Sequence, residues 1–161
     1  RDVILDERDE FADAASVAAG AGTALIGDVI PLGSVARDMG MGEPIWLVIT
    51  CATEIITGGA AGTIKFQLVS DAQAAIATDG SATVHLDSGT FVTDDSAANA
   101  TQMNAGEVIF AAALPNQGNV YEAFLGILAV IGTTAVTAGA INAFLTLDPP
   151  RGKKLYAEGV N

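Results

Sequence analysis

The chain contains one histidine and one cysteine, the side chains that most often act as base and nucleophile in enzymes. Cys51 ends an apolar run that starts at Ile45, a position typical of a buried, inert thiol. His85 lies between Val84 and Leu86, so on a strand its side chain opposes theirs. No local motif supplies His85 with a nucleophile or a carboxylate. We therefore expect Cys51 in the core, His85 in a surface or inter-strand contact, and no enzymatic activity.

Two segments carry residue types that bind ions. Asp94, Asp95 and Asn99 offer oxygen ligands for calcium, but their spacing does not match the alternating ligands and central glycine of an EF-hand loop. Segment 58–65 is glycine-rich like a phosphate-binding loop, yet it lacks the Gly-Lys-Ser/Thr ending and leads into a strand. A single cysteine excludes an intramolecular disulfide and a multi-cysteine metal site. We expect a solvated acidic loop, and neither a metal nor a cofactor.

The remaining candidates would contact other proteins. They are Phe11, Arg37, Asp38, Arg151, Lys153, Lys154 and Tyr156. The Arg-Asp pair lies in a glycine-rich loop, where it either pairs internally or bridges to another chain. The last four residues form a basic cluster with an aromatic ring near the C-terminus. This cluster either docks on an acidic neighbour, including another copy of the chain, or is solvated.

Composition narrows the class of protein. The 161 residues are 50% apolar and only 16% charged, with a formal net charge of −12 and a mean hydropathy of +0.43. From Phe66 to Pro150 there is no lysine or arginine. Such a surface repels nucleic acid and anionic lipid, so neither is expected as a partner. The high apolar fraction indicates that some apolar surface is buried between chains.

The chain pattern predicts seven or eight short strands separated by glycine-rich turns, hence an all-β fold and a β-sandwich. The strands are expected within 25–32, 45–51, 64–69, 83–86, 91–93, 107–114 and, as two runs, 123–147. The last region has no formal charge and is long enough to cross a bilayer. Gly132-Thr133-Thr134 divides it into two strand-length runs, so we expect a buried hairpin rather than a membrane helix.

The two ends of the chain differ from its middle. The first ten residues are highly charged and indicate an extended arm without the apolar core of a signal peptide. A helix over 6–19 is also compatible with the residue propensities, and the alternation there does not decide. We expect an N-terminal arm at 1–22, a sandwich domain at 23–150 and a C-terminal tail at 151–161.

Segment 27–49, GDVIPLGSVARDMGMGEPIWLVI, resembles the capsid cement (decoration) proteins of tailed bacteriophages. The matching residues are Asp28-Val29-Ile30, Leu32-Gly33, Arg37-Asp38, Gly40 and Gly42-Glu43-Pro44 before an aromatic-Leu-Val strand. The segments Ala135 to Ala140 and Leu145 to Asp148 are also similar to that family, which is typified by a Bordetella phage cement protein. The chain departs from the family in its longer middle, 71–106, and in its charged N-terminus.

The resemblance implies a jelly-roll sandwich that decorates the outer surface of a phage head. There it would bridge neighbouring major capsid proteins and stabilise the shell against the pressure of the packaged DNA, after assembly in the host cytoplasm. It implies no catalytic residues and no cofactor. Two-fold and three-fold assembly both remain open, and a homotrimer is favoured over a homodimer on general grounds for decoration proteins.

A β-sandwich that binds carbohydrate or acts as an adhesin is the alternative. Such modules display aromatic side chains that stack on sugars. Here Trp46 lies inside an apolar strand, and Tyr121 and Tyr156 are the only tyrosines.

Overall fold

The computed structural model describes residues 7–33, 43–58, 61–94 and 103–150. These residues form one short 3₁₀ helix, η1, and nine strands in two antiparallel sheets. The elements are η1 (Glu7–Asp9), β1 (Glu10–Ser16), β2 (Gly22–Pro31), β3 (Trp46–Ile56), β4 (Thr63–Asp71), β5 (Thr83–Asp87), β6 (Phe91–Val92), β7 (Val108–Ala113), β8 (Phe124–Gly132) and β9 (Ala138–Thr146).

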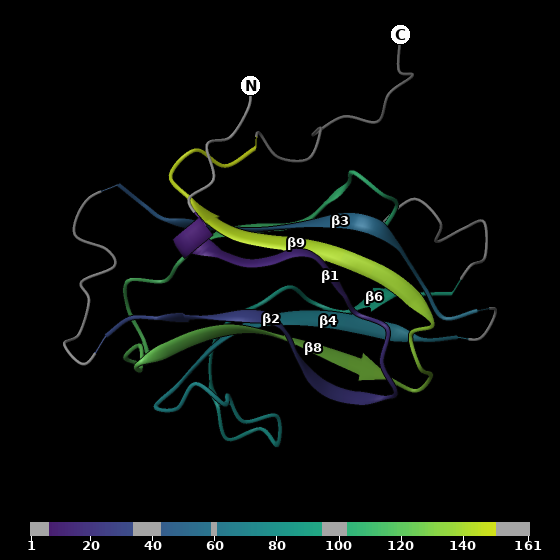
Figure 1. Ribbon diagram of the computed structural model, residues 1–161, viewed down its shortest axis with the longest axis horizontal. Helices are drawn as coiled ribbons and strands as arrows, with labels where there is room; N and C mark the ends of the chain where they lie inside the picture. Colours follow the sequence, from purple (N-terminus) through teal and green to yellow (C-terminus); the bar gives the residue numbers. More distant parts are fainter. Residues whose placement is uncertain (1–6, 34–42, 59–60, 95–102, 151–161) are drawn as a thin grey trace, which may run out of the picture.

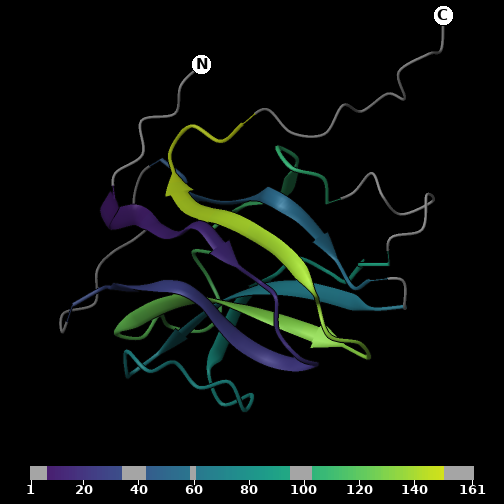
Figure 2. The same ribbon diagram turned by 45° about the vertical axis from the view of Figure 1, so that its right-hand side comes forward.

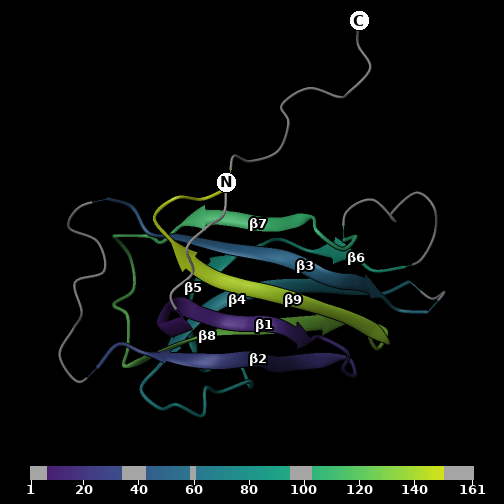
Figure 3. The same ribbon diagram turned by 45° about the horizontal axis from the view of Figure 1, so that its top comes forward.

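The two sheets stack face to face as a sandwich (Figures 1 and 2). One sheet, the β3 sheet, has the order β1-β9-β3-β7, which Figure 3 shows from its outer side. The other, the β4 sheet, has the order β2-β8-β4-β5, and the short β6 pairs with the start of β4. With β6 set aside, the chain changes sheet at every connection except β4–β5. This is the jelly-roll arrangement, and it confirms the expected all-β sandwich.

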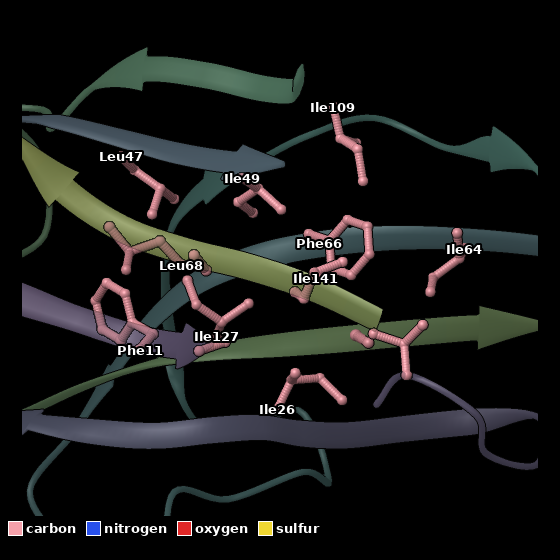
Figure 4. Packing of buried hydrophobic residues seen from close by; sticks show 14 of the residues in the cluster. Phe11, Ile26, Leu47, Ile49, Ile64, Phe66, Leu68, Ile109, Ile127 and Ile141 are labelled. Carbon is pink, nitrogen blue, oxygen red and sulfur yellow. The ribbon is translucent and has the colours of Figure 1, made fainter. Parts of the chain in front are cut away.

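The core lies between the sheets because alternate residues of each strand point inward. On β4, Phe66 and Leu68 are 1% exposed, and on β3, Leu47 and Ile49 are equally buried. Figure 4 shows these side chains meeting Ile127 of β8 between the two layers. Aliphatic side chains dominate this cluster, as expected from the low aromatic content.

The expected arm at 1–22 is wrong from Glu10 onward. β1 pairs with β9 along the edge of the β3 sheet, with Ala12 opposite Ala143 and Ser16 opposite Ala140. Phe11 is 1% exposed and belongs to the core cluster, because burial of its ring favours strand pairing over a solvated arm. A helix over 6–19 is also wrong, since only Glu7–Asp9 are helical there.

The expected hairpin within 123–147 is wrong in a different way. Both strands exist, as β8 and β9, but they belong to opposite sheets and do not pair with each other. Gly132 leads into Thr133, which adopts a positive φ of 63° and turns the chain from one layer to the other. Among the described residues, no helix has the length and apolar character needed to span a bilayer.

Segment 72–82, between β4 and β5, packs on the outer face of the β4 sheet. Ile76 is 5% exposed and forms a second apolar cluster with Val69 and Leu128. Gly126 of β8 leaves the room for this contact, because a Cβ there would lie 2.4 Å from Ile76 Cδ1. The loop hangs below β8 and β4 in Figures 1 and 2. The longer middle, 71–106, therefore contains a cover for the sheet as well as strands β5 and β6.

Candidate functional site

His85 lies at the centre of a polar cluster at one end of the β4 sheet. Leu68 pairs with Leu86 and Val69 pairs with Val84, so His85 is the extra residue of a β-bulge. The bulge places the imidazole beside Ser70 of β4, with 2.7 Å between Nε2 and the Ser70 Oγ. The sequence-based expectation that His85 opposes both its neighbours is wrong, because Leu86 packs on the core whereas Val84 is 41% exposed.

The connection 115–123 from β7 to β8 completes the cluster. The Tyr121 ring stacks on the His85 ring, with centroids 4.0 Å apart and planes inclined by 21°. The Tyr121 hydroxyl donates to the carbonyl of Pro115 at 3.0 Å, within the same connection. The Glu122 amide donates to Ser70 Oγ at 3.1 Å, and the Thr83 hydroxyl donates to Glu122 Oε1 at 2.7 Å. These contacts tie the connection to both β4 and β5; it is the green trace at the left of Figure 3.

The hydrogen-bond pattern assigns the proton positions. Ser70 Oγ accepts the Glu122 amide proton, so its own proton is available for Nε2 of His85. A neutral imidazole with its proton on Nδ1 fits this arrangement, because Nε2 is then the acceptor for the Ser70 proton. Desolvation lowers the pKa of His85 below its ordinary value of 6.5, and the nearby charge of Glu122 opposes this effect in part. Burial also raises the pKa of Tyr121 to about 12.

Ser70, His85 and Glu122 are the residue types of an acyl-transfer triad. Nucleophilic attack requires that a substrate carbonyl reach the serine oxygen. Ser70 is 0% exposed, so a carbonyl has no approach to its oxygen. What this cluster does in the structure is hold the connection 115–123 against the sheet.

Cys51 is buried as expected. Its thiol donates to the carbonyls of Met103 at 3.0 Å and Thr53 at 3.1 Å. Burial is the largest cause that raises the pKa of Cys51 to about 11; the charges of Glu54 and Glu107 contribute to this rise, and a hydrogen bond with the backbone of Ile55 opposes it. A thiol with such a pKa is almost fully protonated at neutral pH and is a weak nucleophile.

The ion-binding candidates gain no support from the described residues. Asp95 and Asn99 lie outside them, and the described part of the chain contains no cluster of three potential metal ligands. In segment 58–65, a Cβ at Gly62 would lie 2.3 Å from Thr57 Cγ2, so this glycine serves close packing. Lys65 donates to Asp87 Oδ2 at 3.0 Å.

Of the seven candidate contact residues, the structure describes only Phe11, whose buried ring offers no surface to a partner. Arg37, Asp38, Arg151, Lys153, Lys154 and Tyr156 lie outside the described residues. An open pocket of about 660 Å³ lies between η1 and the end of β2. Its polar lining is Arg8, Glu10 and Asp28, beside the apolar residues of 29–32. This lining is not a catalytic constellation.

The distribution of charge is strongly asymmetric. Outside the described residues the basic side chains are Arg1, Arg37, Arg151, Lys153 and Lys154, and the acidic ones are Asp2, Asp6, Asp38, Asp95 and Glu158. These five cations and five anions cancel, so the whole formal net charge of −12 resides on the described residues. Their only basic side chains are Arg8 and Lys65.

A sequence model of the Bbp16 family matches residues 11–145, from the second residue of β1 to the next-to-last residue of β9. The chain belongs to the Bbp16 family. This is a family of Bordetella phage proteins, in agreement with the phage resemblance of segment 27–49. The match covers both sheets and begins in β1, which agrees with a domain that starts near Glu10 rather than at residue 23. No curated protein matches the chain.

The sequence analysis did not predict that Ser70, Tyr121 and Glu122 belong to one cluster with His85. Ser70 and His85 are 15 residues apart, and Glu122 is a further 37 residues along the chain. A spacing of this kind carries no motif, because only the bulge and the β7–β8 connection bring the residues together.

Proposed function

We propose that this chain is a structural protein of the virion that decorates the outside of a phage head and cements neighbouring major capsid proteins. The observation that carries the proposal is the Bbp16 match over the whole sandwich. The resemblance of segment 27–49 to cement proteins supports the finer assignment. A jelly roll alone would not, because this fold serves many unrelated functions.

The chemistry of the described residues suits a binding role without catalysis. The cysteine and the histidine are both engaged in internal contacts, and Ser70 is sealed from solvent. We therefore propose that the protein has no enzymatic activity and needs no cofactor.

The acidic sandwich suggests how attachment would work. Its net charge of −12 opposes self-association except where the partner surface is complementary, and it favours electropositive surfaces as partners. On a shell, each copy would contact more than one capsid subunit, so that weak individual contacts add up to stable attachment. We propose that the working unit is a homo-oligomer, with a trimer favoured over a dimer.

Mixing the purified protein with undecorated heads tests this function. Light scattering first gives the mass of the free protein, and sedimentation then separates bound from free copies. We expect a dimer or trimer that co-sediments with the heads at a fixed ratio to the major capsid protein. A protein that stays in the supernatant at all ratios would overturn the proposal, and binding to a glycan array would then favour the carbohydrate-binding alternative.

A pair of truncations locates the attachment. Removing residues 1–6 leaves η1 and β1 intact, and removing 151–161 leaves β9 intact. We expect the N-terminal truncation to lower the occupancy on heads while circular dichroism shows an unchanged β-sheet spectrum. Unchanged occupancy would exclude these residues as an anchor, and the C-terminal truncation serves as the matched comparison.

A further inference from the structure

One titratable side chain, His85, takes part in the contacts that hold the connection 115–123 against β4 and β5. Its Glu122 amide and its Tyr121 ring are the groups that contact β4 and β5, and both contacts involve Ser70 or His85. Two further polar links are the Thr83 hydroxyl, which donates to the Glu122 carboxylate, and the Ala123 carbonyl, which accepts the Leu32 amide at 2.8 Å. His85 is the only histidine of the chain. It is thus the one side chain here with an ordinary pKa between pH 5 and 8.

We propose that Ser70, His85, Tyr121 and Glu122 form a pH-sensitive latch that holds the 115–123 connection at neutral pH and loosens it on acidification, while the sandwich stays folded. This inference is independent of the proposed function.

The chemistry of the latch follows from the donors and acceptors. In the neutral form, Ser70 Oγ accepts from the Glu122 amide and donates to Nε2 of His85. Protonation converts Nε2 into a donor. Ser70 Oγ can accept from both Nε2 and the Glu122 amide with its two lone pairs, but the Ser70 proton loses its acceptor. Because Ser70 is 0% exposed, water cannot replace that acceptor unless the connection moves.

Nearby charges and burial together determine the pKa of His85. The Glu122 carboxylate attracts an imidazolium, whereas burial of the ring disfavours it, and burial is the larger effect on His85. The Tyr121 hydroxyl stays neutral, because its pKa is about 12. From β4, the Asp71 carboxylate that follows Ser70 accepts the amides of Gln73 and Ala77 instead. The pKa of His85 accordingly lies below 6.5, and protonation costs the latched state stability.

Amide hydrogen exchange on the full chain, combined with NMR titration of the single imidazole, tests the latch. Between pH 7.5 and 5 we expect the protection factor of the Glu122 amide to fall, after correction for the intrinsic pH dependence of exchange. Linkage sets the full fall at about tenfold for each unit by which the latched pKa lies below that of the released state, and this full fall is reached only at a pH below both values. Core amides such as those of Leu68 and Ile127 should keep their protection.

Two variants distinguish titration of His85 from a non-specific loosening of the protein at low pH. His85→Gln retains a side-chain oxygen that can accept from Ser70 but cannot titrate, so the pH dependence of Glu122 protection should vanish. Tyr121→Phe loses the bond to Pro115 but retains the stacked ring, so the pH dependence should persist. The proposal is overturned if wild-type protection is flat while His85 titrates, or if the same pH dependence persists in His85→Gln.

Discussion

The loop 72–82 and the connection 115–123 both lie against the β4 sheet, but different interactions hold them. The loop is held by Ile76, which packs on Val69 and Leu128, and by the Asp71 carboxylate, which accepts its backbone amides. The connection is held at this sheet by the Glu122 amide, which donates to Ser70, and by the Tyr121 ring, which stacks on His85 and packs on the core cluster. Apolar packing is insensitive to pH, whereas a histidine contact changes near neutrality. One sheet therefore carries a permanent cover and, by our proposal, a releasable one.

The largest expected effect comes from removing the apolar anchor of the loop. Ile76→Ala deletes a side chain that is 5% exposed, and such a deletion costs about 2–5 kcal/mol of unfolding free energy. Urea denaturation measures this loss. Hydrogen exchange should show faster exchange in 72–82 and unchanged protection of the Glu122 amide. Loss of protection in both segments would show that they open as one cooperative unit, and would contradict the view that different interactions hold them.

A smaller loss of unfolding free energy is expected when a side chain fills the space between the loop and β8. In Gly126→Val, the Cβ would lie 2.4 Å from Ile76 Cδ1 and 3.0 Å from Leu25 Cδ1, so these side chains or the loop must shift. Overpacking of this kind costs about 1–3 kcal/mol. Gly20→Val is the control, because a Cβ there meets no heavy atom within 4 Å. Equal stability of the two variants would contradict the packing of the loop on β8.

The polar latch should contribute less than the apolar anchor. Ser70→Ala removes the acceptor of the Glu122 amide and the partner of His85, at a cost of about 1–2 kcal/mol. Ser81→Ala is the control, because its exposed hydroxyl contacts Asp79 and surface changes cost less than about 0.5 kcal/mol. Thermal unfolding compares the two. A Ser70→Ala protein as stable as Ser81→Ala would mean that the latch adds nothing to stability.

The smallest effects are expected from pH alone, and they separate the two segments. The pKa of His85 is lowered, so its contribution is complete above 6.5 and is lost as pH falls through the lowered value. The pKa of Asp71 is also lowered, by hydrogen bonds from the amides of Ala77 and Gln73. Its contribution persists down to pH 3.8 and is lost below it. As the pH is lowered, amide exchange in 115–123 should thus rise before exchange in 72–82. The reverse order would contradict the assignment of the pH-sensitive contact to 115–123.

The sequence predicted most strands because alternation and apolar runs report directly on strand faces. It did not predict which strands pair. β8 and β9 are adjacent in sequence and both apolar, yet a turn at Thr133 sends them to opposite sheets. Periodicity carries no information about the sheet to which a strand belongs. Phe11 was misassigned for a different reason, since its charged neighbours suggested an arm while its ring fills the core.

The polar cluster was beyond sequence analysis for another reason. A bulge adds one residue to a strand and reverses the faces that alternation predicts. The bulge at His85 has no glycine or proline to mark it. Likewise, segment 72–82 is composed mostly of small and polar residues, so one isoleucine did not indicate a cover for the sheet.

The central claim is that this member of the Bbp16 family is a cement on the outside of a phage head. Cryo-electron microscopy of heads mixed with the protein tests it most directly. We predict density on the outer surface of the shell that fits two stacked β-sheets and touches more than one major capsid subunit. Heads without such density at saturating protein, or density confined to the inner surface or the tail, would contradict the claim.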